Sequence, residues 1–343
     1  MIRNKLLKAF RVAGYAVISC TLMLSCRKNS YEGKVVAVEL NNDKGSYDGA
    51  SLIVIDLDKP EKQAEVLSTG FESAAAPSIS HDGRYLYFQG KKDGDHAWQI
   101  WVTDLQKKRT SRVTDLPENC LFPATLPDGT VIFSREGVVK NKKVYDLYRC
   151  ERDGSALTRI TYDPSINIHA SVLQEGRVLF NSSQQYPDPK TTSLKVMLPD
   201  GTKSEVYYHG NFTAPLTGGS ESTEGYIYFI ETGGGLFRVK HTRPLHTLEY
   251  LSYGHPGNFS SVYPVEAGKL LVSYRPSIYD PFALYSFDAG TKEAPLLLHR
   301  ESGNITDPLL VKSMTVRPSI LPSAVDQNNP TAILMSQDIN HSM

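Results

Sequence analysis

Short runs in which apolar and polar residues alternate recur along most of the chain, and Gly, Asp or Pro bounds each run. Alternation with a period of two is typical of β-strands with one buried face. The runs follow a repeated phrase, in which an acidic or small residue precedes Gly, one further residue and an apolar stretch. Successive glycines of this phrase are 50, 46, 47, 49 and 43 residues apart, at Gly33, Gly83, Gly129, Gly176, Gly225 and Gly268. A period of this length predicts small sheets that stack in a β-propeller or similar array and form one domain.

The second repeat shows the expected elements most fully. Its four expected strands are residues 75–80, 85–89, 99–104 and 110–114. The Asp82-Gly83 pair lies in the first connection, where a tight hairpin needs positive φ. The same pattern recurs at residues 122–160, 169–207, 213–251 and 260–299. Each repeat is therefore expected to be one four-stranded sheet.

The first repeat lacks an opening strand, because the chain reaches Glu32-Gly33 without one. Residues 304–311 match the opening of a repeat but have no Gly turn after them. We therefore expect this C-terminal strand to close the ring in the first blade, which would remove the exposed edges of an open sheet. The predicted fold is an all-β, six-bladed β-propeller of four-stranded blades over residues 27–312. Residues 313–343 are expected to be a proline-containing, truncated C-terminal extension.

Residues 1–26 differ from the rest of the chain and resemble a bacterial lipoprotein signal. Basic residues precede an apolar stretch at 12–25, which is too short to span a bilayer and ends at Cys26. Cys20 is a second candidate for acylation, but cleavage there would leave an apolar segment on the mature protein. A plain signal peptide or a membrane anchor is the alternative. The interpretation we favour is a lipid on Cys26 that holds the protein in the envelope of a Gram-negative-type bacterium, at the outer membrane or in the periplasm.

Composition adds few constraints. The chain has 343 residues, and its 37 basic and 37 acidic side chains give a net charge of zero. Bulk charge therefore gives no reason to expect a nucleic-acid partner. After export, Cys120 and Cys150 remain in an oxidising compartment and fall in the same repeat. A disulfide and a pair of buried free thiols are both open, and free thiols are favoured because the first and third strands of a blade are not neighbours.

Two segments carry a family resemblance. Residues 77–88, Pro-Ser-Ile-Ser-His-Asp-Gly-Arg-Tyr-Leu-Tyr-Phe, and the Ile-Trp-Val at 100–102 resemble the WD40-like (PD40) repeat of TolB-type propellers. The chain is also similar to the family of propellers that resemble the middle domain of the hydrazine synthase alpha subunit. That likeness is carried by Leu121-Phe122-Pro123, Asp307-Pro308, Arg317-Pro318 and Leu321-Pro322-Ser323. The resemblance implies a propeller fold over most of residues 75–340.

Members of the second family often bind haem through a Cys-x-x-Cys-His motif. This sequence contains no Cys-x-x-Cys pair. We therefore expect no covalently bound haem and predict no cofactor. The resemblance implies the fold and does not imply hydrazine synthesis.

Five repeats place an asparagine where the first strand begins, and the remaining one has Ser73 there. In a propeller this place is the mouth of the central channel, so these side chains could contact a ligand. Asx turns are the alternative role. Two residues further on, His169 is the titratable side chain expected to face the channel, either as a ligand contact or as a structural residue. The candidate asparagines are Asn119, Asn167, Asn211, Asn258 and Asn304.

Connections between second and third strands are expected to be long loops on the same face as these asparagines. They are residues 41–50, 91–98, 135–144, 183–192 and 275–282. Binding concentrates on long loops of a rigid scaffold, and aromatic residues and Arg anchor most interfaces. The candidate partner-binding residues in these loops are Trp98, Tyr186, Arg275 and Tyr279.

The sequence favours a non-catalytic, lipid-anchored envelope propeller that binds a protein or glycan partner through its long-loop face. It contains no Gly-x-Ser-x-Gly, phosphate-loop or dinucleotide motif and no metal-type spacing of histidines. No catalytic residue and no metal are therefore predicted. One alternative is a propeller hydrolase or lyase that acts on envelope or dietary glycans or peptides. The other is a shortened, haem-less relative of a multihaem redox protein.

Overall fold

The computed structural model describes residues 29–41, 45–190, 192–210, 214–314 and 317–323. The chain divides into two compact units, Met1–Ser30 and Tyr31–Met343. The described part of the second unit is built from strands, with one 3-10 turn, η1 (Pro244–His246). Within the described residues, no helix has both the length and the hydropathy that a membrane crossing requires. Cys20 and Cys26, on which the predicted lipid anchor depends, lie outside the described residues.

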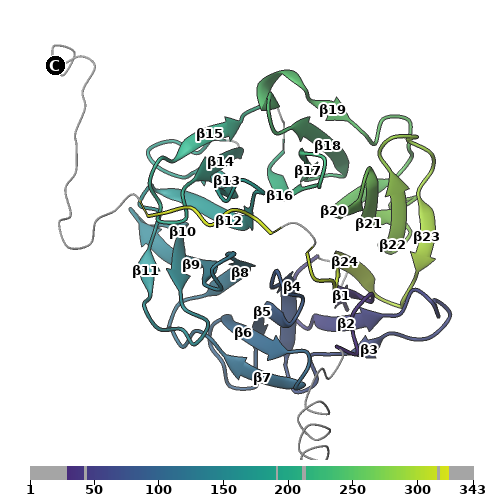
Figure 1. Cartoon of the computed structure of the whole chain (residues 1–343), viewed down its shortest axis with the longest axis horizontal. Coiled ribbons are helices and arrows are strands. Elements are labelled where there is room, and N and C mark those ends of the chain that lie inside the picture. Colours follow the sequence, from purple (N-terminus) through teal and green to yellow (C-terminus); the bar gives the residue numbers. More distant parts are fainter. Residues whose placement is uncertain (1–28, 42–44, 191, 211–213, 315–316, 324–343) are drawn as a thin grey trace, which may run out of the picture. The chain divides into compact units, whose positions relative to one another are not determined.

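The strands form sheets that follow one another along the chain (Figure 1). One sheet has the order β24 (Asn304–Leu310), β1 (Val35–Leu40), β2 (Ser51–Ile55) and β3 (Glu65–Val66). The next has β4 (Ser73–Ile79), β5 (Tyr85–Lys91), β6 (Gln99–Asp104) and β7 (Arg109–Arg112). Two further sheets have the orders β16 (Leu216–Glu221), β17 (Tyr226–Glu231), β18 (Gly235–Lys240), β19 (Glu249–Tyr250), and β20 (Asn258–Glu266), β21 (Lys269–Arg275), β22 (Ala283–Asp288), β23 (Leu296–His299).

The remaining eight strands form one larger sheet that consists of two antiparallel halves. The first half contains β8 (Cys120–Thr125), β9 (Val131–Val139), β10 (Lys142–Cys150) and β11 (Thr158–Arg159). The second contains β12 (Ser165–Val172), β13 (Val178–Gln184), β14 (Ser193–Met197) and β15 (Glu205–Tyr208). A single parallel pairing, Tyr145 opposite Ile166, joins the halves through β10 and β12.

The predicted all-β architecture of four-stranded antiparallel sheets is confirmed. In the second repeat the strand expected at 99–104 has these bounds in the structure, and the other three differ by one to two residues at their ends. The Asp82-Gly83 turn joins β4 to β5, and Gly83 has a φ of +69°. β24 pairs antiparallel with β1, with Val35 opposite Leu310 and Leu40 opposite Asn304. The first and last described strands of the unit therefore belong to one sheet.

Apolar side chains from neighbouring sheets pack together to form the core. One cluster joins Tyr87 and Ile100 of the β4–β7 sheet to Phe133 and both cysteines of the next sheet. Cys120 and Cys150 are free and buried, and burial raises the pKa of both thiols to about 12. The favoured interpretation of these cysteines is therefore confirmed. They serve as small apolar side chains.

The prediction of a long loop at residues 135–144 is wrong. β9 and β10 continue through this range and are joined by a two-residue turn at Lys140-Asn141. Both turn residues have positive φ, +48° and +62°, as a tight twisted hairpin requires. The prediction failed because the Lys- and Glu-containing stretch has no apolar alternation, although its backbone pairs throughout.

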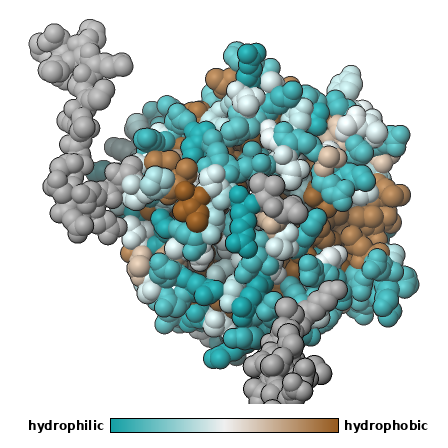
Figure 2. All heavy atoms as spheres, in the orientation of Figure 1, coloured by the Kyte–Doolittle hydropathy of each residue, from teal (hydrophilic) through white to brown (hydrophobic). Residues whose placement is uncertain are grey.

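Figure 2 shows a mostly hydrophilic surface, with hydrophobic side chains gathered at the edge formed by β22 and β23, where Leu296 and Leu297 are exposed.

Candidate functional site

We call the first strand of each four-stranded unit, β24, β4, β8, β12, β16 or β20, its innermost strand. These strands contain similar bulges, and the bulges shape the site. β4, β8, β12, β16 and the β24–β1 pair each shift register near the middle of the strand. Each bulge contains at least one residue with positive φ, which costs about 1–2 kcal/mol for residues other than glycine. Those that line the cavity include Ala76, Phe122, His169, Gly218 and Asp307. Five bulges therefore place a positive-φ residue in the wall of one cavity.

This central cavity has a volume of about 590 Å³, within the range of small-molecule sites. Tyr47, from the loop between β1 and β2, meets Phe122 with ring centroids 6.5 Å apart. The ring of His169 also contacts Phe122, with centroids 4.0 Å apart. Hydroxyl groups line much of the remaining wall, from Ser78, Thr125, Ser171, Thr217, Ser220, Ser260, Ser261 and Thr306.

Asp307 supplies a carboxyl group next to the Tyr47 ring. Tyr47 donates its phenolic O–H to Asp307 Oδ2 at 2.6 Å, and the Thr306 hydroxyl lies 3.4 Å from Oδ1. The backbone N–H of Asp307 donates to Ser261 Oγ at 2.9 Å, which fixes the bulge. Burial raises the pKa of Asp307, whereas the hydrogen bond from Tyr47 lowers it. Burial and the neighbouring carboxylate hold the pKa of Tyr47 well above its usual value.

His169 faces the cavity as a neutral imidazole. Burial lowers its pKa to about 4, so the ring carries no charge at neutral pH. Its contact with Phe122 is a ring contact, and its nitrogens make no hydrogen bond to the described part of the chain. The imidazole therefore offers one acceptor and one donor to the cavity.

Arg275 also lines the cavity. Its guanidinium carbon lies 4.6 Å from the centre of the Phe282 ring. Arg275 Nε is buried and has no hydrogen-bond partner in the described structure. Phe282, over which Arg275 lies, donates its backbone N–H to Asn304 at the start of β24. Asn304 precedes Asp307 by three strand residues, which separates the two by about 10 Å along the strand. The structure thus places Arg275 at the end of the cavity where β24 begins.

Three of the predicted channel-mouth asparagines bond to the preceding sheet. Asn119 Oδ1 accepts the Trp98 N–H at 2.9 Å, and Asn304 Oδ1 accepts the Phe282 N–H at 2.9 Å. Asn258 donates to the carbonyl of Gly233. Each side chain therefore ties the start of an innermost strand to the loop after the second strand of the sheet before it.

The other members of this set have different environments. Ser73 Oγ accepts the Gly49 N–H at 2.9 Å and so repeats the bracing contact. Asn167 is fully buried and donates to Asp163 Oδ1 at 2.8 Å, whereas its Oδ1 has no partner among the described residues. Asn211 lies outside the described residues. Among the predicted asparagines, Asn304 lines the cavity.

The loops that follow the second strands share one end of the unit with the links between sheets, because the asparagine contacts join them. We call this end the long-loop end. Tyr279 is 91% exposed and Tyr186 40% exposed in these loops, whereas Trp98 is half-buried. The links between sheets add Tyr162 and Tyr253, both exposed, which the sequence analysis missed because it considered only the longer loops.

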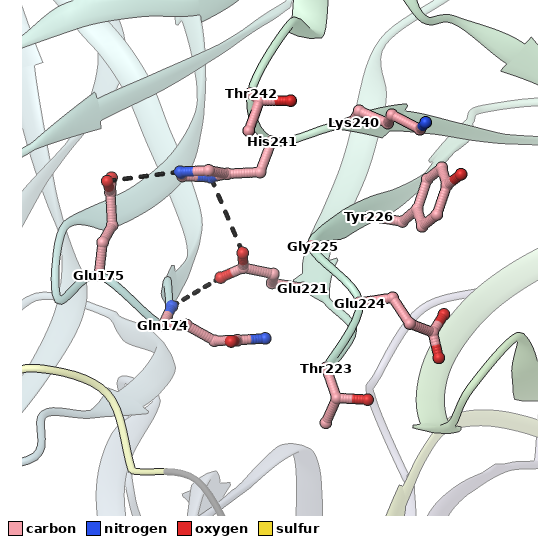
Figure 3. Close-up of a pocket in the computed structure, with 10 residues that line it drawn as sticks. All are labelled: Gln174, Glu175, Glu221, Thr223, Glu224, Gly225, Tyr226, Lys240, His241 and Thr242. Atoms are coloured by element: carbon pink, nitrogen blue, oxygen red, sulfur yellow. Dashed lines mark hydrogen bonds and ion pairs between the residues drawn. The ribbon is translucent and has the colours of Figure 1, made fainter.

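The opposite, turn end carries the tight first connections and a second pocket of about 620 Å³. Figure 3 shows His241 between two carboxylates in this pocket. His241 Nε2 lies 3.4 Å from Glu175 Oε2, and Nδ1 lies 3.7 Å from Glu221 Oε1. Glu221 also accepts the Gln174 N–H at 2.6 Å, and burial raises its pKa. Within the described residues, no group of His, Cys, Asp and Glu side chains is placed to hold a metal.

The C-terminal segment, residues 312–314 and 317–323, lies against the turn end. The Met314 N–H donates to the His81 carbonyl at 2.9 Å, and Met314 lines the central cavity. The Ser319 N–H donates to the Gln174 carbonyl at 2.9 Å. The yellow segment in Figure 1 can be followed across β12. The turn end of the cavity is therefore partly covered by backbone of the same chain.

Comparisons with known proteins place the fold. No family model matches the chain. It is 24% identical to hydrazine synthase subunit alpha of Kuenenia stuttgartiensis over 66% of this chain and 37% of that protein. The solved Kuenenia stuttgartiensis hydrazine synthase has a TM-score of 0.74 at 20% identity, over 85% of this chain and 48% of that one. TolB from Acinetobacter baumannii has a TM-score of 0.54 at 15% identity, over 81% of this chain and 66% of that one.

These likenesses show a β-propeller fold of the kind that hydrazine synthase and TolB contain. The chain spans between a third and a half of the length of the hydrazine synthase subunit. The predicted resemblance to both propeller families is thus confirmed at the level of the fold.

The sequence contains one signal for the cavity, a proline or glycine that follows the positive-φ residue of most bulges. Three of the five positive-φ residues precede proline, in Ala76-Pro77, Phe122-Pro123 and Asp307-Pro308, and a fourth belongs to the pair Gly218-Gly219. Ala76 and Phe122, at the bulges, line the cavity. Tyr47 could not have been found this way, because its position depends on a loop that folds back over β24.

Proposed function

We propose that this protein is a non-catalytic envelope propeller that binds a protein or glycan partner through its long-loop end. The observation that carries the proposal is the exposure of Tyr162, Tyr186, Tyr253 and Tyr279 in loops and links at this end. Exposed tyrosines cost little in stability and supply large contact areas with a polar tip, which is why they anchor interfaces.

The proposed architecture is a closed ring of six blades. The single parallel pairing between β10 and β12 supports counting the larger sheet as two blades. The pairing of β24 with β1 supports closure within the first blade. A closed ring gives the loops a rigid base, which lowers the entropic cost of binding a partner.

The proposed attachment is a lipid on Cys26. It is supported by the basic and apolar segments that precede this residue and by the polar Arg27-Lys28-Asn29 that follows. Metabolic labelling with a fatty acid tests the assignment in Cys26→Ala and Cys20→Ala variants. Label that persists in Cys26→Ala and disappears in Cys20→Ala would reverse it.

Partner capture from an envelope extract tests the long-loop end. We expect a Tyr186→Ala, Tyr279→Ala double variant to capture at least tenfold less partner than the unmodified chain. The matched control is Leu245→Ala with Leu248→Ala, which removes two exposed apolar side chains in the loop between β18 and β19, at the turn end. Treating the extract with a protease or with periodate separates a protein partner from a glycan. Equal capture by both double variants and the unmodified chain, at equal stability, would exclude the long-loop end.

An enzyme is the second candidate, and the central cavity is the observation that favours it. Asp307, Tyr47 and His169 all line this cavity with shifted pKa values, and such groups cluster at catalytic sites. A hydrolase or lyase would lose turnover when Asp307 is changed to Asn. Unchanged turnover of envelope glycans or peptides by that variant would remove this candidate.

A further inference from the structure

The central cavity contains the carboxyl group of Asp307. Asp307 accepts hydrogen bonds from two hydroxyl groups, those of Tyr47 and Thr306, and makes no ion pair within the described part of the chain. A carboxylate in a buried site is ordinarily paired with a cation, because its desolvation is otherwise uncompensated. Arg275 lines the same cavity but lies over Phe282, at the end where β24 begins.

The surroundings of Asp307 suit a positively charged nitrogen. The Tyr47 hydroxyl contacts the carboxyl group, the Phe122 ring lies 6.5 Å from the Tyr47 ring, and aromatic faces attract cations. His169, which contacts Phe122 and lines the same cavity, is a neutral imidazole with an unused acceptor. A primary ammonium has three N–H donors and no acceptor, so it matches a carboxylate, an imidazole nitrogen and hydroxyl oxygens.

We propose that the central cavity binds the primary ammonium group of a small organic amine. Asp307 is its counter-ion, His169 is a second acceptor, and the rings of Phe122 and Tyr47 form the walls around it. The amine enters from the long-loop end, because Met314 and the C-terminal segment cover part of the turn end. The cavity volume of about 590 Å³ leaves room for an organic group beyond the nitrogen. The serine and threonine hydroxyls of the wall can bond to polar atoms of that group.

The other charged groups of the cavity agree with this assignment. Glu221, the second carboxyl group that lines it, is already engaged by the Gln174 N–H and His241. His81 and His169 both have pKa values lowered by burial, so neither competes for Asp307 as a cation at neutral pH. Asp307 is therefore the acidic group of the cavity that remains available to a ligand.

Calorimetric titration of the full chain with matched pairs of small molecules tests the proposal. The probes are ethylamine and phenethylamine, each compared with the alcohol of the same shape, ethanol and 2-phenylethanol. We expect at least one amine to bind at least tenfold more tightly than its alcohol. The N-trimethyl analogue of phenethylamine, which has no N–H donor, should bind at least fivefold more weakly than phenethylamine. Absence of binding by both amines, or equal binding of amine and alcohol, would overturn the proposal.

Two substitutions locate the ammonium. Asp307→Asn preserves side-chain size and tolerates the left-handed backbone at this position, where φ is +49°. It should weaken amine binding at least tenfold, whereas Asp58→Asn, which removes the same charge from an exposed loop, should not change it. Equal affinity of Asp307→Asn and the unmodified chain would contradict the assignment.

Tyr47→Phe keeps the test decisive if Asp307→Asn fails to fold. It removes the hydroxyl that donates to Asp307 and preserves the ring. Because losing this hydrogen bond raises the pKa of Asp307, the titration is made at about pH 8, where a primary amine is still protonated. Folded Tyr47→Phe should still bind phenethylamine more tightly than 2-phenylethanol, and equal binding of the two would contradict the counter-ion role of Asp307. These titrations involve no loop partner, so their outcome is independent of partner capture at the long-loop end.

Discussion

The two ends of the central cavity are built in different ways. At the long-loop end, asparagine and serine side chains brace β4, β8, β20 and β24 against the sheet before each, and tyrosines project from the loops. At the turn end, short glycine turns allow the C-terminal backbone to pass close over them. A Cβ on Gly83 would lie 2.9 Å from the backbone of Lys312, and one on Gly176 would lie 2.2 Å from Ser319 O.

The difference indicates which end is available for recognition. Backbone packed on backbone leaves little room for side chains to vary, so the turn end is suited to covering the cavity. Braced strand ends provide a rigid rim, while the loops beyond them can vary in length and sequence. The comparison therefore predicts large stability effects at the turn end and small ones in the loops at the other end.

The largest loss of stability should come from a truncation that removes β24, which we compare with a shorter truncation that keeps it. A chain that ends at Gly303 loses β24, which exposes the edge of β1 and removes Ile305 and Leu309 from the core. It should lose most of its unfolding free energy, which for domains is about 5–15 kcal/mol. A chain that ends at Lys312 keeps β24 and should lose far less. Urea unfolding followed by circular dichroism measures both, and equal stability of the two shortened chains would contradict the role given to β24.

Glycine substitution at the turn end should have the next largest effect. Gly176→Ala places a methyl group against Ser319 O at a φ of +97°, so both strain and overlap oppose it. We expect a loss of about 3–4 kcal/mol. Gly129→Ala is the matched control, because Gly129 occupies the same turn position at φ +91° with nothing within 4 Å of the added methyl. It should cost about 1 kcal/mol, from strain alone. Equal losses would mean that the C-terminal segment adds nothing at Gly176.

The cavity between the two ends should show itself in the pH dependence of stability. Burial lowers the pKa of His169 from 6.5 to about 4, so the unfolded chain binds the extra proton between these values. Stability should therefore fall as pH drops from about 6.5 to 4, and His169 should account for about 1–3 kcal/mol of the fall. Below about pH 4 this residue should contribute no further change. His169→Asn should flatten this part of the profile. In the chain that ends at Lys312, water can reach the cavity, and the pKa of His169 measured by NMR should move back toward 6.5. An unchanged pKa there would show that the C-terminal segment does not shield the cavity.

Sequence reasoning succeeded where the local pattern determines the structure. The Gly phrase and the period-two alternation fix each hairpin, because turn chemistry and burial of one face act within a few residues. The 304–311 strand was found for the same reason, since it matches the other opening strands. The site was harder to predict, because its side chains come from separate elements: Asp307 from β24, Tyr47 from the loop between β1 and β2, and His169 from β12. Their contacts depend on bulges that break the alternation on which the strand prediction rests.

The asparagines recur at one place in the repeat, and the contacts of those that are described became clear only from the structure. Asn119 and Asn304 recur because each must accept a backbone N–H from the neighbouring sheet. A sequence shows that an amide recurs, but it does not show whether the amide faces a ligand or a backbone. Tyr279 was selected correctly as an exposed side chain because its loop has no apolar alternation that would bury it.

The smallest effect should come from the loops of the long-loop end. Tyr253 and Tyr279 are 82% and 91% exposed, so changing both to Ala removes little buried surface. The unfolding free energy should change by less than about 0.5 kcal/mol. Tyr274→Ala is the matched control, because this tyrosine is 4% exposed and packs against Phe259 and Tyr285, and its loss should cost about 3–5 kcal/mol. A loss above about 1 kcal/mol in the loop variant would mean that these tyrosines support the fold. The contrast between a covered end and a receptive end would then fail, since the loops would be part of the packed structure as well.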